Sequence, residues 1–266
     1  MSIPIERWEA CGNTYLLVER ERVGRPLVAA AAIALCDRVS GLGADGVLEL
    51  LPGAGPVRLS MVIWNPDGST TEACGNGTRM AARWASERSG EERIVVGTEA
   101  GPLHCTVTGE QVHAVMAEAG LTGHQYRPTD EPFPYPHRFV TIGNPHVVIP
   151  VDDVDGFPLA TEGPELERHP WFPERTNVEV MAPIDEHRIR MRVWERGVGE
   201  TPACGTGACA AAVAAIADGM AVSPVTVEVP GGELVVDVGH DGAVTLSGPA
   251  RRVEEILLDA DLRAAG

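Results

Sequence analysis

The stretch M-R-V-W-E-R-G-V-G-E-T-P-A-C-G-T-G-A-C-A-A-A, residues 191–212, has the pattern of a strand, a glycine-rich turn and an alanine-rich helix. A second stretch, M-V-I-W-N-P-D-G-S-T-T-E-A-C-G-N-G-T-R at residues 61–79, has the same pattern. Both contain M-x-[VI]-W followed, after nine residues, by C-G-x-G, and the cysteines Cys74 and Cys204 are 130 positions apart (204 − 74 = 130). A shared pattern of this length indicates an internal duplication rather than chance similarity between two turns.

A second pair of landmarks supports the duplication. Gly12-Asn13 and Gly143-Asn144 each precede an apolar strand, in the same order relative to the cysteine stretches. We therefore predict two homologous halves, residues 1–118 and 119–249. Residues 119–137 are rich in Gly, Pro and His, which is typical of a connection rather than a helix or strand. The segment R-R-V-E-E-I-L-L-D-A-D-L predicts a last helix within residues 250–266, which we expect to pack back on the first half.

The composition of the 266 residues favours a globular, cytoplasmic protein. Hydrophobic residues make up 44% of the chain, which is enough for a sizeable core. No apolar run approaches the roughly 20 residues that span a bilayer, and the N-terminus lacks the pattern of a signal peptide. The missing apolar run predicts no membrane partner, and the net charge of −17 repels phosphate backbones, so we expect no nucleic-acid partner.

All 21 basic residues are arginine, because the sequence contains no lysine. Chemistry that uses a lysine of the chain is therefore excluded, including an internal pyridoxal phosphate aldimine, a Schiff-base aldolase mechanism and a P-loop. The six cysteines contain no C-x-x-C pair, so we predict no structural zinc site and no metal. The G-L-G-A-D-G match at residues 41–46 follows a predicted helix and precedes a strand, which is the reverse of the dinucleotide-binding order.

In each half the cysteine is predicted to open a helix, where backbone N–H groups are unpaired and carry partial positive charge. This placement is expected to lower the thiol pKa and to leave N–H groups that bind a carboxylate. If a pseudo-two-fold axis relates the halves, Cys74 and Cys204 face each other across a cleft. Two thiols on opposite sides of one carbon invert its configuration without a cofactor, by exchanging acid and base roles. Buried structural cysteines and a single nucleophilic cysteine remain open alternatives at this point.

Five segments together resemble the diaminopimelate epimerase family: G-L-G-A-D-G-V, W-N-P-D-G-S-T-T-E-A-C-G-N-G-T-R, I-G-N-P-H-V-V-I, F-P-E-R-T-N-V-E-V and W-E-R-G-V-G-E-T-P-A-C-G-T-G-A-C-A-A-A. The resemblance implies an isomerase that needs no pyridoxal phosphate or other cofactor. It would interconvert LL- and meso-2,6-diaminopimelate in lysine and peptidoglycan precursor biosynthesis, with its active site in the cleft between the halves. The implied fold is α+β, with two pseudo-symmetric α/β domains, each a mixed sheet rolled around a central helix, and such proteins are usually homodimers.

The same resemblance assigns roles to residues of this chain. Cys74 would take the proton from the LL isomer and Cys204 from the meso isomer. The implied substrate-binding residues are those that hold the reacting carboxylate (Gly75, Asn76, Gly205 and Thr206), the reacting amino group (Asn13 and Glu195) and the distal centre (Asn65, Asn144, Asn177 and Arg196).

Thr14 departs from the family pattern, which usually has aspartate there, and it leaves the choice of substrate open. Three other functions compete with the epimerase. They are a cofactor-free racemase of another amino acid, a two-lobed amino-acid-binding protein without chemistry, and a hydrolase that uses Cys74 and His146. The intact distal set disfavours the first alternative, and the paired helix-opening cysteines disfavour the second. The third leaves the duplicated cysteine unexplained.

Overall fold

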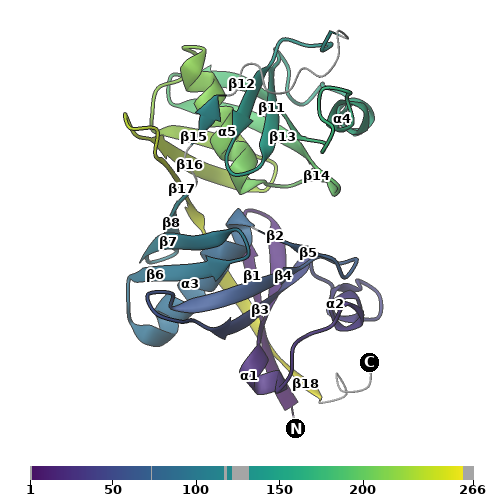
Figure 1. The fold of residues 1–266 in the computed structure, drawn as a ribbon, viewed down its shortest axis with the longest axis vertical. Coiled ribbons are helices and arrows are strands. Elements are labelled where there is room, and N and C mark those ends of the chain that lie inside the picture. The colour runs from purple at the N-terminus through teal and green to yellow at the C-terminus, as the bar shows by residue number, and fades with distance from the viewer. Residues whose placement is uncertain (1, 73, 117–118, 122–131, 260–266) are drawn as a thin grey trace. The chain divides into compact units, whose positions relative to one another are not determined.

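The computed structural model describes residues 2–72, 74–116, 119–121 and 132–259, and the chain forms two compact units (Figure 1). The first unit comprises Met1–Ala114 and Gly248–Gly266, so it is built from both ends of the chain. The second unit comprises the continuous segment Val115–Ser247. Within the described ranges, every helix is too short or too polar to pass through a membrane.

The first unit is a mixed sheet with three helices. The β2–β3 and β4–β6 pairs are parallel, and the β1–β2, β3–β4, β4–β5, β6–β7, β7–β8 and β1–β18 pairs are antiparallel. Its elements are β1 (Ser2–Ala10), β2 (Asn13–Glu19), α1 (Arg20–Val23), α2 (Ala29–Cys36), β3 (Gly46–Pro52), β4 (Leu59–Trp64), β5 (Thr70–Thr71), α3 (Gly75–Ser89), β6 (Arg93–Thr98), β7 (Gly101–Thr108), β8 (Gln111–Val115) and β18 (Arg251–Asp259).

The helix α3 is the centre of the first unit. It packs against β1, β2, β3, β4, β6 and β7, so the sheet curves around it. Small side chains, such as Ala81 and Ala82, face these strands and are completely buried, which lets the helix approach the sheet closely. The helix ends at Gly90, whose positive φ of 74° gives the left-handed cap in which its N–H bonds the carbonyl of Ser86.

The second unit repeats this plan. The β11–β12 and β13–β15 pairs are parallel, and the β9–β10, β10–β11, β12–β13, β13–β14, β15–β16 and β16–β17 pairs are antiparallel. Its elements are β9 (Gly120–Leu121), β10 (Arg138–Thr141), β11 (Pro145–Pro150), α4 (Leu159–Glu167), β12 (Asn177–Asp185), β13 (Arg188–Glu195), β14 (Gly199–Thr201), α5 (Gly205–Ala217), β15 (Val225–Val229), β16 (Gly232–Val238) and β17 (Val244–Pro249).

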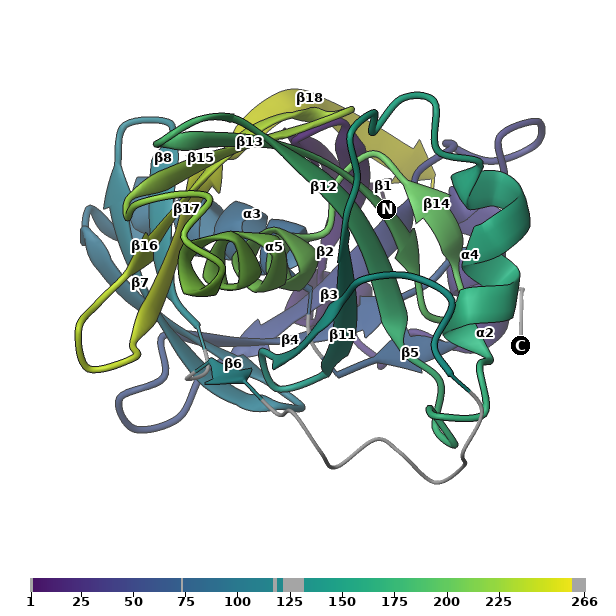
Figure 2. The ribbon, with the colours of Figure 1, turned by 90° about the horizontal axis from the view of Figure 1, so that it is seen from above.

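The helix α5 is the buried core of the second unit. Figure 2 shows it with β11, β12, β13, β15 and β16 around it, and the same strands contact it. Residues Ala208–Ala212 are completely buried, because only alanine-sized side chains fit where strands surround a helix on most of its circumference. The prediction of an alanine-rich helix after the glycine-rich turn of residues 191–212 is confirmed, and this helix, α5, begins at Gly205, directly after Cys204.

The strand registers of the two units correspond residue by residue. Tyr15 lies opposite Gly46 in the β2–β3 pair, and His146 lies opposite Asn177 in the β11–β12 pair. Likewise, Val47 lies opposite Trp64, and Val178 lies opposite Trp194. One residue further along, Leu48 pairs with Ile63 and Glu179 pairs with Val193. The matched positions are therefore Tyr15 with His146, Gly46 with Asn177, and Leu48 with Glu179.

The predicted helix at the end of the chain is wrong for residues 251–259, which form strand β18 antiparallel to β1. The apolar spacing of Val253, Ile256 and Leu257 suggested a helix. The strand form instead places Ile256 and Leu258 on the core of the first unit, with backbone bonds to the exposed edge of β1. A sheet partner outweighs local helical spacing. Residues 260–266 of the prediction lie outside the described residues, as do residues 122–131 of the predicted connection.

Candidate active site

Both cysteines of the duplicated stretch cap the central helix of their unit. Cys74 is the N-cap of α3, and the backbone N–H of Gly77 donates to its Sγ at 3.3 Å. Cys204 is the N-cap of α5, and the N–H of Gly207 donates to its Sγ at 3.4 Å. Each sulfur thus takes the place of the usual oxygen acceptor at a helix start. The prediction that each cysteine opens a helix is confirmed.

The second glycine of each C-G-x-G segment is required by the strand beneath it. A Cβ atom at Gly77 would lie 2.9 Å from Cδ2 of Leu48, and one at Gly207 would lie 2.8 Å from Oε1 of Glu179. Both distances are below the contact distances that Cβ atoms adopt. The glycines therefore let the helix start rest directly on matched strand positions, which fixes the height of each thiol above the sheet.

In the first unit, Tyr15 of β2 lies beside Cys74. The thiol donates to the Tyr15 Oη at 3.6 Å, and the Cys74 side chain is half-buried. The Tyr15 ring lies over β3 at Gly46, where a Cβ atom would be only 2.4 Å from the ring carbon Cε1. A missing side chain on β3 thus makes room for the aromatic ring that contacts the thiol.

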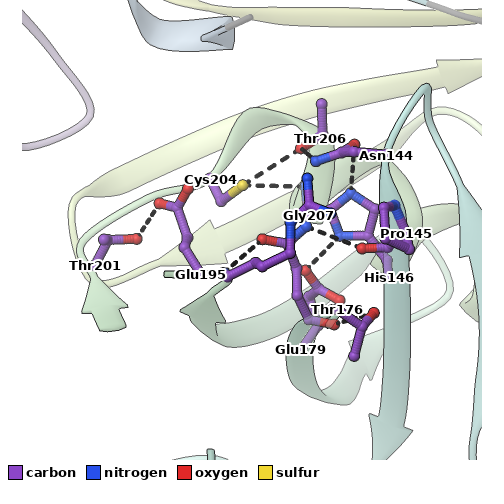
Figure 3. A network of polar contacts seen from close by, with 12 residues as sticks. Asn144, Pro145, His146, Thr176, Glu179, Glu195, Thr201, Cys204, Thr206 and Gly207 are labelled. Carbon is purple, nitrogen blue, oxygen red and sulfur yellow. Dashed lines mark hydrogen bonds and ion pairs between the residues drawn. The ribbon is translucent and has the colours of Figure 1, made fainter. Parts of the chain in front are cut away.

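In the second unit, the Cys204 thiol is buried, with 7% of the residue exposed. Its Sγ lies 3.5 Å from Oγ1 of Thr206, and the Glu195 carboxyl lies beside it, held by a hydrogen bond that the Thr201 hydroxyl donates (Figure 3). Burial raises the pKa of the Cys204 thiol well above its usual range, and the charges of Glu195 and Glu179 act in the same direction.

The expectation of a lowered thiol pKa is therefore wrong for Cys204. The bonds from Thr206 and from the Gly207 N–H do lower its pKa, as a helix start should, but loss of water outweighs them. Burial also raises the pKa of Glu195, although bonds from Thr201 and Cys204 oppose the shift. Both acids therefore hold their protons to a higher pH than they would in water.

A buried polar chain lies beneath Cys204 (Figure 3). His146 and Glu179 are almost fully enclosed, and Nδ1 of His146 is 2.6 Å from Oε1 of Glu179. The other ring nitrogen, Nε2, is 2.9 Å from Oδ1 of Asn144. The amide of Asn144 in turn donates to Oγ1 of Thr206 at 3.4 Å. This chain connects the buried carboxylate of β12 to the first turn of α5, next to the thiol.

Asn177 and Arg196 meet at the end of the same sheet. The backbone N–H of Arg196 donates to Oδ1 of Asn177 at 2.9 Å, and the Asn177 amide donates to the carbonyl of Pro145 at 2.9 Å. The exposed Arg196 guanidinium donates to the carbonyl of Glu174 at 3.3 Å. The second unit thus brings together seven of the predicted site residues: Asn144, Asn177, Glu195, Arg196, Cys204, Gly205 and Thr206.

The predicted site residues of the first unit lie on three of its segments. Asn13 is the first residue of β2, and Asn65 follows β4, where its amide donates to Oγ of Ser69 at 2.9 Å. Asn76, in the first turn of α3, accepts from the buried Arg79 guanidinium at 2.6 Å.

Thr14 is anchored by the carboxylate of Asp45. Its backbone N–H donates to Oδ2 of Asp45 at 2.8 Å, and its hydroxyl donates to the same atom at 3.2 Å. Across residues 2–72, 74–116, 119–121 and 132–259, no cluster of three or more His, Cys, Asp or Glu side chains is arranged to hold a metal ion.

Sequence reasoning missed the buried carboxylate Glu179. The signal was present, since Glu179 is the one charged residue within the apolar run V-E-V-M of a strand, at a place where the first half has Leu48. A charge inside a buried strand requires a partner, and that partner is His146.

Comparison with known proteins places these features in a family. The profile of the family described as diaminopimelate epimerase matches residues 9–121 and 138–253. The diaminopimelate epimerase of Synechococcus elongatus is 40% identical over 273 residues, covering 95% of this chain and 97% of the relative. That of Pelotomaculum thermopropionicum is 41% identical over 263 residues, covering 91% and 94% of the two chains.

Solved structures share the fold at low identity. A phenazine biosynthesis protein of the PhzF family from Bacillus anthracis has a TM-score of 0.68 at 16% identity and covers 97% of this chain and 99% of its own. A probable proline racemase from Agrobacterium radiobacter has a TM-score of 0.67 at 15% identity and covers 97% and 93%. The fold is thus the α+β fold of two repeated halves that these proteins share. The matched cysteine caps and the identities along nearly the whole sequence lead to one conclusion: this chain belongs to the diaminopimelate epimerase family.

Proposed function

We propose that this protein epimerises LL-2,6-diaminopimelate to meso-2,6-diaminopimelate, without pyridoxal phosphate, in lysine and peptidoglycan precursor biosynthesis. The observation that carries the proposal is the pair of cysteines that cap matched helices in the two units, in a chain about 40% identical to epimerases of that name. A two-base epimerisation needs one group that takes a proton and another that gives one, and the duplication supplies two thiols in the same backbone setting.

In the proposed reaction, Cys74 acts as a thiolate that takes the α-proton of the LL isomer. Cys204 acts as a thiol that gives its proton to the opposite face of the same carbon. The raised pKa of Cys204 supports this assignment, because the group that donates must be protonated when the substrate binds. After one LL-to-meso turnover Cys74 holds the proton and Cys204 is the thiolate, so the two thiols exchange protons with the solvent before the next turnover in that direction. In the meso-to-LL direction the two roles exchange.

The remaining roles follow from the chemistry of each group. Backbone N–H groups at a helix start stabilise the reacting carboxylate and the negative charge that develops beside it. We assign this role to Gly75, Asn76, Gly205 and Thr206. The reacting amino group is assigned to Asn13 and Glu195. The distal L-centre is assigned to Asn65, Asn144, Asn177 and Arg196, since a guanidinium binds a carboxylate in bidentate fashion.

The proposal also covers assembly and location. We propose a homodimer in the cytoplasm, with one epimerase half at residues 1–118, on which residues 250–266 pack, and the other at residues 119–249. Sedimentation equilibrium measures the assembly directly. A mass equal to that of one chain at micromolar concentration would remove the dimer from the proposal and leave the chemistry untouched.

The chemistry is tested by incubating the protein with LL-diaminopimelate in D2O and following the products by NMR. The wild type is expected to form meso product that carries solvent deuterium at one α-carbon. Cys74→Ala and Cys204→Ala are each expected to stop epimerisation. The matched controls are Cys105→Ala and Cys209→Ala, which remove buried thiols that cap no helix in the same two units. Epimerisation at the wild-type rate by either capping variant would overturn the two-thiol mechanism.

A further inference from the structure

Glu167, the last residue of α4, is a buried carboxylate that the proposed reaction does not use. Only 2% of the residue is exposed. Its Oε2 accepts the indole N–H of Trp194 at 2.8 Å, and its Oε1 accepts the backbone N–H of Gly197 at 3.1 Å. The guanidinium of Arg175 donates to the same Oε1 at 3.4 Å. Because three donors bond this buried carboxylate, its position in the structure is firmly held.

The donors come from two different loops. Arg175 belongs to the segment that connects α4 to β12, and its φ of 62° is unusual for a residue other than glycine. Such a conformation persists only where neighbouring contacts hold it. Gly197 belongs to the turn between β13 and β14, and it also has a positive φ, of 76°. One carboxylate therefore holds both loops, each at a residue with a positive φ.

Arg196 contacts both of the loops that Glu167 holds. Its backbone N–H is fixed by Asn177, the first residue of β12, and the next residue along the turn is the Gly197 that Glu167 holds. Its guanidinium reaches across to the carbonyl of Glu174, which is next to the Arg175 that Glu167 also holds. The Glu167 carboxylate holds both loops, and the two loops together determine where the Arg196 guanidinium lies.

We infer that Glu167 is a positioning residue for the distal-carboxylate subsite, and that it makes the enzyme selective for a substrate with a second carboxylate by holding Arg196 in place. The inference rests on the proposed function, in which Arg196 binds that carboxylate. Glu167 itself does not touch the substrate. Glutamine keeps only one of the two acceptor oxygens, so Glu167→Gln leaves either the Gly197 N–H or the Trp194 indole facing an NH2 group instead of an acceptor, and the turn that carries Arg196 shifts.

The first unit supplies a matched control. Glu49 is equally buried and accepts the indole N–H of Trp64, the counterpart of Trp194, at 3.1 Å. Its other donors are the Arg20 side chain at 2.7 Å and the backbone N–H of Leu27 at 2.9 Å, neither of which belongs to a turn that carries a charged site residue. The variant Glu49→Gln therefore measures the general effect of neutralising a buried carboxylate bonded to a matched tryptophan.

The experiment compares kcat and KM for LL-diaminopimelate in the wild type, Glu167→Gln, Glu49→Gln, Arg196→Ala and the double variant with both Glu167→Gln and Arg196→Ala. We expect Glu167→Gln to raise KM about tenfold, the factor that loss of one charge-assisted hydrogen bond corresponds to, with kcat within about threefold of the wild type. Glu49→Gln is expected to leave KM within about twofold. In the Arg196→Ala background, Glu167→Gln should add no further rise in KM, because both changes act on the same guanidinium.

Three outcomes would overturn the inference: a KM of Glu167→Gln equal to that of Glu49→Gln, a fall in kcat at unchanged KM, or effects of Glu167→Gln and Arg196→Ala that multiply. An unchanged KM in Arg196→Ala would instead contradict the assignment of the distal carboxylate in the proposed function. Thermal unfolding of each variant accompanies the kinetics. If Glu167→Gln does not fold, Glu167→Asp replaces it, because aspartate keeps the charge but is one carbon too short to reach all three donors, and the same KM comparison decides.

Discussion

The two units share strand order, register and a capping cysteine, but the residues beneath the two caps differ in kind. In the first unit the matched positions hold Tyr15 and Leu48, a ring and an aliphatic side chain. In the second they hold His146 and Glu179, a buried polar pair. The difference shows that a duplicated backbone keeps the thiol's position, while side-chain changes on the strands below set its chemical surroundings.

The groups beside the two thiols differ in the same way. The residue after the matched tryptophan is Asn65 in the first unit and Glu195 in the second. Asn65 bonds Ser69, whereas Glu195 lies beside Cys204 and helps to raise its pKa. A two-base epimerase needs one thiol that gives a proton while the other takes one, so unequal surroundings for equal positions suit the proposed reaction.

The largest loss of unfolding free energy is expected when the strand residue beneath Cys204 is replaced by the one at the matched place in the first unit. Glu179→Leu introduces the residue found at the matched place and leaves His146 buried without its carboxylate partner. We expect a loss of about 3–5 kcal/mol of unfolding free energy, as for a buried pair broken by removing one member. Chemical denaturation measures it. Glu179→Gln is the control, and its loss should be smaller because it keeps an acceptor. Equal losses in the two variants would show that the pair adds nothing specific.

A smaller effect is expected from making the first unit resemble the second. Gly46 matches Asn177, and a Cβ atom there would lie 2.4 Å from the Tyr15 ring. Gly46→Ala should therefore cost about 1–3 kcal/mol, the usual penalty for overpacking. In a Tyr15→Leu background the penalty should shrink but not vanish, because the Cβ would also lie 2.7 Å from the carbonyl oxygen of Trp64. A penalty that is the same in both backgrounds would mean that the ring does not require the glycine.

Removing the charge beside Cys204 is expected to shift its titration. Glu195 is the second cause of the raised thiol pKa, after burial, so Glu195→Gln should move the pH midpoint of Cys204 alkylation downward without restoring the usual value. Rates of iodoacetamide labelling against pH, read by peptide mass spectrometry, provide the measurement. An upward shift would contradict the assignment of causes.

The same raised pKa has a consequence for stability. A thiol whose folded pKa lies above its unfolded value keeps its proton in the native state at pH values where the unfolded chain has lost it. Its contribution is therefore complete below the usual thiol pKa and declines as the pH rises toward the folded value. Cys204→Ala should flatten this alkaline decline of the unfolding free energy. If the unfolding free energy of Cys204→Ala fell as steeply with rising pH as that of the wild type, groups other than Cys204 would cause the decline.

The smallest effect is expected at Thr206, whose replacement should move the pKa of Cys204 upward, opposite to the effect of Glu195→Gln. Its hydroxyl, 3.5 Å from Sγ of Cys204, lowers the thiol pKa. Thr206→Val keeps the shape and removes the bond, so the alkylation midpoint should move slightly upward, by a bond worth at most about 1 kcal/mol. A downward shift, in the direction expected for Glu195→Gln, would show that the hydroxyl does not act on the thiol.

The sequence alone predicted the parts of the fold that repeat. The duplication, the central helices and the cysteine at each helix start all follow from matched spacing, and the structure has them. The final strand was mistaken for a helix, because the pairing partner that decides it, β1, lies about 250 positions away along the chain. The pKa direction of Cys204 was wrong for a related reason. A helix start can be recognised from a motif, whereas the burial that outweighs it depends on strands brought together by the fold.

Antiparallel pairing between β1 and β18 joins the first and last parts of the described chain in one unit, from Ser2 opposite Asp259 to Glu9 opposite Arg251. A ribosome makes β1 before the continuous second unit and β18 after all of it. The second unit therefore has all its strands available earlier than the first. The N-terminal unit, usually the first to fold during synthesis, is here the last to be completed. Until then, β1 presents one unpaired edge, which exposes the nascent protein to mispairing during that interval.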